Sequence, residues 1–363
     1  MLKPGPVFTR PRTPAAKCLH LVRLNPIITR SELVEATGLS QPTITRATAA
    51  LLQKGLVQER NDLTRSRGRG RPTVPLEVAE NNWILAGIAV GTSQTHIGFY
   101  DTMGRTIRED DVPTPVAQLS EEDFIEHIMA GVNRLMTGLD RKLVSVGVTT
   151  SGTVDNEDRI TASNLGWENV DIAERLRFQF GVPVVVSSAI PAILGSETQA
   201  AELGNTDPVL VLFADDSIGA ALSANDEVSQ IIPLPATSQL ADPEESLTTA
   251  AVLRKLGRTG TLAEAVAAAA NNPAERKILD DRARQLGEIA ALLVNEYKPA
   301  TVVVAGSAFL DDPAAPKLFA AAVREKTGRS TQLRVIPSLK EIVRAITRTI
   351  ALDPLLRVPL ELF

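Results

Sequence analysis

Three arginines alternate with glycines in the stretch SRGRGRPTV, at residues 66–74. Guanidinium groups neutralise phosphates or enter a narrow minor groove of DNA, and glycines let the backbone approach the duplex closely. The residue types and spacing of Arg67, Arg69 and Arg71 therefore predict contacts with DNA. A disordered cationic linker is the alternative interpretation of the same residues.

The residues on either side of these arginines predict a β-hairpin. Residues 54–78 have the pattern of a strand, a tip and a second strand, with apolar residues on both sides of the tip. These apolar residues are Leu56 and Val57 before the tip, and Val74, Leu76 and Val78 after it. We therefore expect the arginines to lie at the tip of the wing of a winged helix.

A helix-turn-helix is predicted directly before this wing. The apolar spacing in AAKCLHLVRL predicts a first helix over residues 15–24. The residues TRSE at 29–32 predict the capped start of a second helix, and Gly38 ends it. After a tight turn, QPTITRATAALLQK at 41–54 predicts a third helix with Ser40 as its N-cap.

The third helix is predicted to be the recognition helix. Arg46 can reach a guanine edge or a phosphate, and Gln41 and Thr43 near the helix start suit phosphate or base-edge contacts. The apolar and the groove-facing side chains fall on opposite faces, Ile44, Ala47 and Leu51 against Thr45, Arg46 and Ala49. We therefore expect Gln41, Thr43, Thr45 and Arg46 to contact DNA; an ordinary surface helix is the alternative.

Charge and composition support this division of the chain. Residues 1–75 contain 13 Lys and Arg against 4 Asp and Glu, a formal charge of +9, so the remaining residues carry −14 of the total of −5. A basic module joined to an acidic body indicates that the first part binds a polyanion. No secretory signal and no run of 18 apolar residues is visible, so we expect a cytoplasmic protein.

The residues after the wing predict an α/β body of two lobes, because segments typical of strands alternate with segments typical of helices. The expected organisation is a DNA-binding domain at 1–78 and a body at 79–363. Within the body we expect lobes at about 82–190 and 191–345 and a C-terminal segment at 346–363.

From about Ala15 onwards the chain resembles the ROK family, whose name joins repressors, uncharacterised reading frames and sugar kinases. The resemblance rests on SELVEATGLSQPTITRATAALLQKGLV followed by GRGRPTVPLEV, on AGIAVGTSQTHIGFYDTMG, on VGVTTSGTVD followed by NLGW, and on IGAAL and VVVAGSAF. It implies an N-terminal winged helix, as in the regulators of the family. It also implies an actin-like, sugar-kinase-type body that commonly binds a sugar and dimerises or tetramerises.

Three departures from the family's kinases indicate a body without kinase activity. Ala89 stands where the kinases have the acid of their first phosphate loop, so the residue that would organise magnesium is missing. Asp215 and Asp216 stand in the second phosphate loop, where their charges would repel a nucleotide. Ala189 replaces the aspartate that serves as general base, and alanine has no titratable group.

Other sites implied by the family are only partly present. The family's zinc motif has no counterpart between Ala224 and Glu244, and one cysteine with three histidines offers no substitute, so we expect no metal and no other cofactor. Asn164 and Glu245 match positions near the family's sugar site, which makes them the candidate ligand-binding residues. A turn residue and a helix-start carboxylate are the alternative interpretations of these two.

Taken together, the sequence predicts a transcriptional regulator, most simply a repressor, that binds operator DNA as a homodimer or higher homo-oligomer. A body that senses a carbohydrate is one possibility, and a regulator that responds to a partner protein or to no ligand is another. A sugar kinase is the disfavoured alternative. Residues 285–297 or 343–363 are the expected dimer contacts, because both segments are largely apolar.

Overall fold

The computed structural model describes residues 7–64, 74–200, 207–328 and 331–362. The chain divides into two compact units. The first contains Met1–Asn205 together with Arg344–Phe363, and the second contains Thr206–Val343. Within the described ranges, none of the helices combines the length and the apolar character that a membrane-spanning segment needs.

The first unit begins with the three helices expected from the sequence. Thr13 caps the first of them by accepting a hydrogen bond from the Ala16 N–H at 3.2 Å. Thr29 and Glu32 form the predicted capping box, and Gly38 ends the second helix in the left-handed conformation. These elements are α1 (Pro14–Leu24), α2 (Arg30–Thr37) and α3 (Gln41–Gln53). The helix-turn-helix prediction is confirmed.

The third helix begins after Ser40 as predicted, but Ser40 does not cap it through its side chain. The Ser40 hydroxyl instead pairs with the Thr43 hydroxyl at 2.9 Å. A two-stranded ribbon follows α3 and forms the described part of the wing. It consists of β1 (Val57–Glu59) and β2 (Leu76–Val78), which pair antiparallel, with the short helix η1 (Asn61–Leu63) after β1.

A five-stranded sheet with the order β10-β6-β3-β4-β5 forms the centre of the first unit. Strand β4 pairs antiparallel with β3 and with β5, whereas β6 pairs parallel with β3 and with β10. The strands are β3 (Trp83–Val90), β4 (Gln94–Tyr100), β5 (Thr106–Pro113), β6 (Lys142–Thr150) and β10 (Val184–Ser188). A small second sheet contains β7 (Thr153–Val154), β8 (Ile160–Ala162) and β9 (Trp167–Val170). The short helix η3 (Ser163–Leu165) joins β8 to β9 and contacts η2 (Val116–Gln118).

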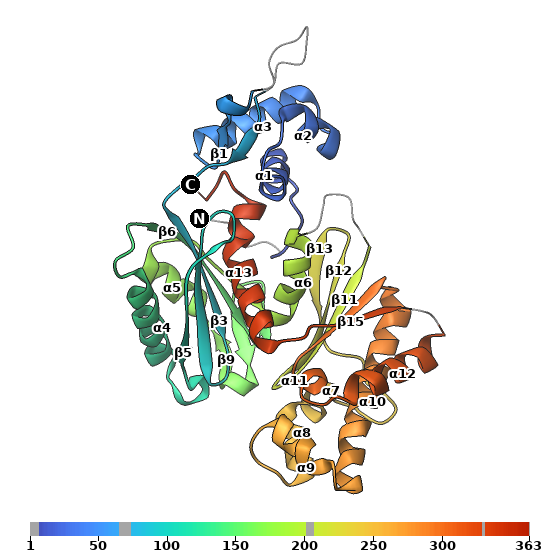
Figure 1. Cartoon of the computed structure of the whole chain (residues 1–363). Coiled ribbons are helices and arrows are strands. Elements are labelled where there is room, and N and C mark those ends of the chain that lie inside the picture. The colour runs from blue at the N-terminus through green and yellow to red at the C-terminus, as the bar shows by residue number, and fades with distance from the viewer. Residues whose placement is uncertain (1–6, 65–73, 201–206, 329–330, 363) are drawn as a thin grey trace. The chain divides into compact units, whose positions relative to one another are not determined.

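Helices cover both faces of the five-stranded sheet, as Figure 1 shows. Alternate side chains of β3 separate the faces, so that Ile84 and Ala86 pack with α4 and α5 while Leu85 packs on the opposite side. The helices on one face are α4 (Glu121–Met136) and α5 (Ile172–Phe180), and those on the other are α6 (Ala189–Ala200) and α13 (Leu339–Arg357).

The second unit repeats this sheet topology. Its strand order is β13-β12-β11-β14-β15, again with an antiparallel hairpin and third strand on one side and two parallel strands on the other. The strands are β11 (Val209–Ala214), β12 (Ile218–Ala224), β13 (Glu227–Ile231), β14 (Thr301–Ala305) and β15 (Gln332–Val335). The α/β body expected from the sequence is therefore present, and the structure adds that its two five-stranded sheets share one topology.

Six helices are described in the second unit, and two of them pack closely together. A Cβ atom at Gly287 would lie 2.7 Å from the Phe319 carbonyl oxygen, so glycine lets α10 approach α12. The six are α7 (Pro243–Ser246), α8 (Thr249–Leu256), α9 (Leu262–Ala269), α10 (Pro273–Tyr297), α11 (Ser307–Leu310) and α12 (Ala315–Thr327).

The compact units differ from the lobe limits expected from the sequence. The limit expected at 190/191 falls inside α6, whereas the units divide at 205/206 and at 343/344. Helix α6 belongs to the first unit because it follows β10 directly and packs on β10 and β6. The winged helix, expected as a separate domain at 1–78, also belongs to this unit.

One hydrophobic cluster explains why the winged helix is part of the first unit. Side chains of α1, α2 and α3 pack with residues of α13 and of the five-stranded sheet, and we call this cluster the junction core. Its members include Cys18, Leu19, Val22, Leu33, Ile44 and Leu51 from the winged helix, and Leu85, Val144, Ala351, Leu352, Leu355 and Leu356 from the body.

We expect Leu355→Ala to destabilise the protein by about 2 to 5 kcal/mol, because Leu355 is fully buried and its truncation leaves a cavity. Urea unfolding followed by circular dichroism measures this loss. Leu292→Ala is the control, because Leu292 is 43% exposed. A loss below about 0.5 kcal/mol, the usual range for surface substitutions, would contradict the importance of the junction core.

Candidate nucleic-acid interface

Helix α3 has the two faces predicted from the sequence. Ile44 and Leu51 are fully buried and Ala47 is 7% exposed, and these three pack in the junction core. Thr45 and Arg46 are exposed on the opposite face, together with Ala49. Gln41 is exposed at the start of the helix and Thr43 is half-buried. The structure therefore brings the four predicted DNA-contacting residues of α3 together at the surface.

The polar side chains of this face differ in how much hydrogen-bonding capacity they keep. The Thr45 hydroxyl donates to the Gln41 carbonyl oxygen at 2.9 Å, and the Thr43 hydroxyl pairs with Ser40. In the part of the chain that the structure describes, the side chains of Gln41 and Arg46 have no hydrogen-bond or ion-pair partner. The amide of Gln41 and the guanidinium of Arg46 are therefore the groups best able to bind an external partner.

Arg30 fixes α3 relative to its neighbours. Its Nε donates to the Thr48 hydroxyl at 3.1 Å, and its Nη2 forms an ion pair with Glu59 at 2.7 Å. The Thr48 hydroxyl donates in turn to the Ile44 carbonyl oxygen at 2.9 Å. Sequence reasoning missed this link between α2, α3 and β1, because the three residues have no spacing that marks them as partners.

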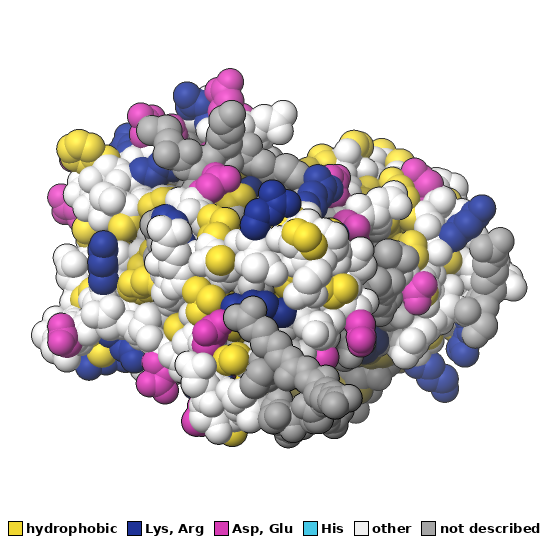
Figure 2. Space-filling model, turned by 90° about the horizontal axis from the view of Figure 1, so that it is seen from above, with side chains coloured by type: hydrophobic (Ala, Val, Ile, Leu, Met, Phe, Trp, Pro, Cys, Tyr) yellow, Lys and Arg dark blue, Asp and Glu magenta, His cyan; other side chains and the backbone are white. Residues whose placement is uncertain are grey.

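The predicted wing arginines, Arg67, Arg69 and Arg71, lie outside the described residues. In the described part of the wing, Arg60 forms ion pairs with Asp62 at 2.6 Å and with Glu77 at 2.8 Å. Its charge is therefore balanced within the wing. On the face that Figure 2 shows, Lys and Arg side chains are interspersed with Asp and Glu side chains.

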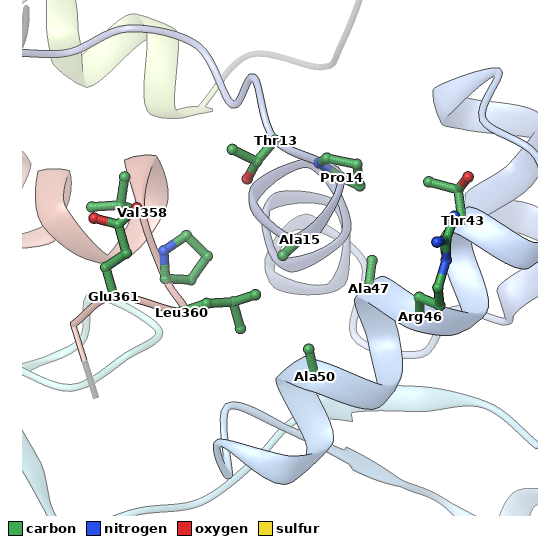
Figure 3. A pocket seen from close by; sticks show the side chains of 11 residues that line it. Thr13, Pro14, Ala15, Thr43, Arg46, Ala47, Ala50, Val358, Leu360 and Glu361 are labelled. Carbon is green, nitrogen blue, oxygen red and sulfur yellow. The ribbon is translucent and has the colours of Figure 1, made fainter.

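A pocket of about 410 Å³ lies against the flank of α3, and we call it the α3 pocket. Figure 3 shows its three walls, which are the start of α1, the helix α3, and the residues after α13. The lining residues are Thr13, Pro14, Ala15, Thr43, Arg46, Ala47, Ala50, Val358, Pro359, Leu360 and Glu361. Sequence reasoning missed this pocket, because its walls come from segments that are distant in the chain.

The two candidate sugar-binding residues lie in different compact units. Asn164 is half-buried in η3, where its Oδ1 accepts a hydrogen bond from the Ser151 hydroxyl at 2.9 Å. Glu245 is exposed on α7, and its backbone N–H donates to Asp242 at 3.0 Å. Trp167, three residues after Asn164, is buried and meets the Phe124 ring edge-on at 5.0 Å between centroids.

The loop after β11 matches the second phosphate loop of the kinases in the family resemblance. In this chain it contains a polar network within the second unit. Asp215 follows β11, and its Oδ1 accepts a hydrogen bond from the Ser307 hydroxyl at 2.6 Å. Burial raises the pKa of the Asp215 carboxyl, which the bond from Ser307 opposes. Arg282 is 4% exposed, and its Nε donates to the Leu247 carbonyl oxygen at 2.9 Å and its Nη2 to the Thr249 hydroxyl at 3.3 Å. Sequence reasoning noted the carboxylates but missed Arg282 and Ser307.

A metal site would need several His, Cys, Asp or Glu side chains close together. Among the residues that the structure describes, no three His, Cys, Asp or Glu side chains are placed to hold a metal ion. Cys18 is buried in the junction core, and burial raises the pKa of its thiol to about 11. The thiol is therefore almost entirely protonated at neutral pH, which makes it a packing residue.

Solved structures share this fold. A ROK family transcriptional regulator described as a homologue of the Escherichia coli MLC protein has a TM-score of 0.73 at 16% identity, with 94% of this chain and 98% of that chain covered. A ROK family glucokinase from Streptomyces griseus, in complex with glucose and AMPPNP, has a TM-score of 0.59 at 18% identity, with 74% and 99% covered.

Sequence comparisons identify relatives and the family. A transcriptional regulator of Mycobacterium tuberculosis is 32% identical over 348 residues, covering 85% of this chain and 77% of the relative. The xylose repressor of Bacillus subtilis is 22% identical over 210 residues, covering 56% and 53%. Residues 19–58 match the winged helix-turn-helix DNA-binding family and residues 85–230 match the ROK family. With a winged helix before two sheets of the same topology, this chain belongs to the ROK family.

Proposed function

We propose that this protein is a DNA-binding transcriptional regulator, most simply a repressor, that reads operator DNA with α3. The observation that carries this proposal is the exposed polar face of α3, on which Gln41 and Arg46 have no partner among the described residues. A helix of 13 residues is about 20 Å long and fits a major groove about 12 Å wide. The family and the names of the relatives agree with this role.

Within this proposal the residues of α3 have different tasks. Arg46 can bind O6 and N7 of a guanine with two parallel hydrogen bonds, or a phosphate. Gln41 can bind an adenine edge in the same bidentate way. Thr43 and Thr45 already use their hydroxyls within the helix start, so they suit contacts to the phosphate backbone. Arg67, Arg69 and Arg71 of the wing add phosphate or minor-groove contacts.

The body acts in this proposal as a non-catalytic part of the regulator. With Ala89 and Ala189, the chain lacks two groups that the kinase reaction needs. The residues directly before and after each of these positions have no carboxylate either. By the family resemblance, Asp215 matches the second phosphate loop of the kinases, where its charge would repel a nucleotide. A sugar kinase remains the alternative, since the glucokinase of Streptomyces griseus shares the fold of the body.

A carbohydrate effector is a further part of the proposal. The Asn164 amide nitrogen and the Glu245 carboxylate have no partner among the described residues, so both could bind sugar hydroxyls. The alternatives are a partner protein as the effector, or a regulator without a ligand. A ligand present at 100 times its dissociation constant stabilises a protein by about 2.7 kcal/mol, so thermal shifts with sugars and with sugar phosphates distinguish the first case from the other two.

A homodimer is also proposed, because one winged helix contacts too few base pairs for high selectivity. The segments expected to form the dimer contact are mostly buried within the chain itself. Leu286, Ile289 and Leu293 of α10 lie in the core of the second unit, and Leu352 and Leu355 of α13 lie in the junction core. A dimer contact through these segments would therefore use their exposed side chains, such as Leu292 of α10, which is 43% exposed.

The first prediction concerns base reading by α3. Arg46→Ala should weaken binding to the cognate site by about 1 to 3 kcal/mol and relax base preference at one position in each half-site. Binding to random DNA should change less. The cognate site is obtained by selecting bound fragments from genomic DNA, and affinities are then measured by fluorescence anisotropy.

Lys142→Ala is the matched control for this prediction, because it removes one exposed positive charge from β6 of the same unit. It should leave the affinity for the cognate site unchanged. An equal loss of affinity for cognate and random DNA in Arg46→Ala would show that Arg46 supplies only general attraction and does not read a base.

A second prediction concerns the wing. Replacing Arg67, Arg69 and Arg71 together by alanine should weaken binding to cognate and random DNA alike. The plot of log affinity against log salt should become less steep by about 0.9 for each lost phosphate contact. An unchanged affinity and an unchanged slope would indicate that the three arginines belong to a solvated linker.

A third prediction concerns the body. The purified protein should release no ADP from ATP, magnesium and common hexoses, because the acid at position 89 and the base at position 189 are absent. A coupled assay measures ADP, with a ROK glucokinase as the positive control. Sugar-dependent ADP release that disappears in Asp215→Ala would overturn this prediction.

A further inference from the structure

The α3 pocket has the properties of a small-molecule site. Its volume of about 410 Å³ lies in the usual range for such sites, about 300 to 1,000 Å³. Most of its lining is apolar, and the residues responsible are Pro14, Ala15, Ala47, Ala50, Val358, Pro359 and Leu360. All of its walls belong to one compact unit. Figure 3 shows Ala47 and Ala50 on one wall facing Leu360 on another, so small side chains keep the space open.

The polar groups around this apolar surface define the chemistry of an occupant. Arg46 lies at one end of the pocket next to Thr43, and Glu361 lies on the opposite wall (Figure 3). The Arg46 guanidinium has no ion-pair partner in the described ranges of the chain, so it favours an anion at its end. The Glu361 carboxylate repels an anion at the other end and thereby orients the occupant.

From these features we infer that the α3 pocket binds a small organic anion with an apolar body, such as a medium-chain or aromatic carboxylate. The carboxylate would bind Arg46, and the apolar body would lie between Ala47, Ala50 and Leu360. Neither of the candidate sugar-binding residues, Asn164 and Glu245, is among the lining residues of this pocket.

Binding at this position has a direct consequence for the proposed function. Arg46 is both a lining residue of the α3 pocket and the side chain proposed to read DNA, so one guanidinium cannot serve both partners. The anion and DNA therefore compete, and by linkage each weakens the other by the same factor. This consequence rests on the proposed DNA binding, whereas the binding of the anion itself does not.

The experiment uses the full-length protein and octanoate as the probe, with 1-octanol as an uncharged analogue of similar apolar length. Isothermal titration calorimetry should detect one octanoate site per chain. Ala50→Leu should weaken octanoate binding by about tenfold or more, because the larger side chain occupies the pocket. Arg46→Gln should weaken octanoate binding but leave 1-octanol binding unchanged, because only the anion uses the guanidinium.

Two further variants guard against indirect effects. Leu360→Glu places a negative charge in the wall that lies outside the winged helix, and it should also weaken octanoate binding. Ala130→Leu makes the same change as Ala50→Leu at an exposed position of α4, and it should bind octanoate as the wild type does. The absence of octanoate binding at millimolar concentration, or wild-type binding by both Ala50→Leu and Leu360→Glu, would overturn the inference.

Competition is tested by measuring DNA affinity with and without octanoate. At about ten times its own dissociation constant, octanoate should raise the apparent dissociation constant for DNA about tenfold in the wild type. It should have no such effect on Leu360→Glu. Octanoate binding with unchanged DNA affinity would disprove the competition. If the protein does not bind DNA at all, the proposed function fails, and calorimetry still decides whether the pocket binds the anion.

Discussion

The position of the DNA-binding helix depends on the junction core. A module of about 75 residues with short helices and a small ribbon buries little apolar surface when it is alone. Here Leu352, Leu355 and Leu356 of α13 add their side chains to those of α1, α2 and α3. Because a close-packed core has few intermediate arrangements, the orientation of α3 within the first unit is set by packing and not by a flexible linker.

Several contacts fix α13 on the sheet of the first unit. A Cβ atom at Gly87 would collide with the Thr347 carbonyl oxygen, and one at Gly147 with the Ile350 carbonyl oxygen, so glycines in β3 and β6 let the helix lie directly on the sheet. At its other end, buried Asp353 accepts a hydrogen bond from the Phe8 N–H at 2.7 Å and pairs with Arg357 at 3.0 Å. Helix α13 thus joins the sheet to the winged helix.

The same helix receives the chain from the second unit. The division at 343/344 falls within α13, so one of the two covalent connections between the units enters the element that carries the junction core. A displacement of the start of α13 would therefore act on packing that α1 and α3 share.

The sequence predicted contacts between residues that are close in the chain, but not contacts between residues that are far apart in the chain. The capping box of Thr29 and Glu32, the turn at Gly38 and the two faces of α3 were predicted correctly, because each depends on neighbours within one or two helical turns. The junction core and the α3 pocket were not predicted, because both combine the first 60 residues with the last 25. Those long-range contacts leave no periodic pattern in the sequence.

The Asp215 network shows how one fold can support different chemistry. Ligands of α/β sheets bind beyond the carboxyl ends of parallel strands, and Asp215 and Ser307 lie just beyond such ends, those of β11 and β14. Glycines at this position would expose backbone N–H groups to a phosphate, whereas Asp215 presents a carboxylate that Ser307 already satisfies in part. Since a regulator and a glucokinase share this fold, the fold alone cannot identify the function, which depends on the side chains that the fold positions.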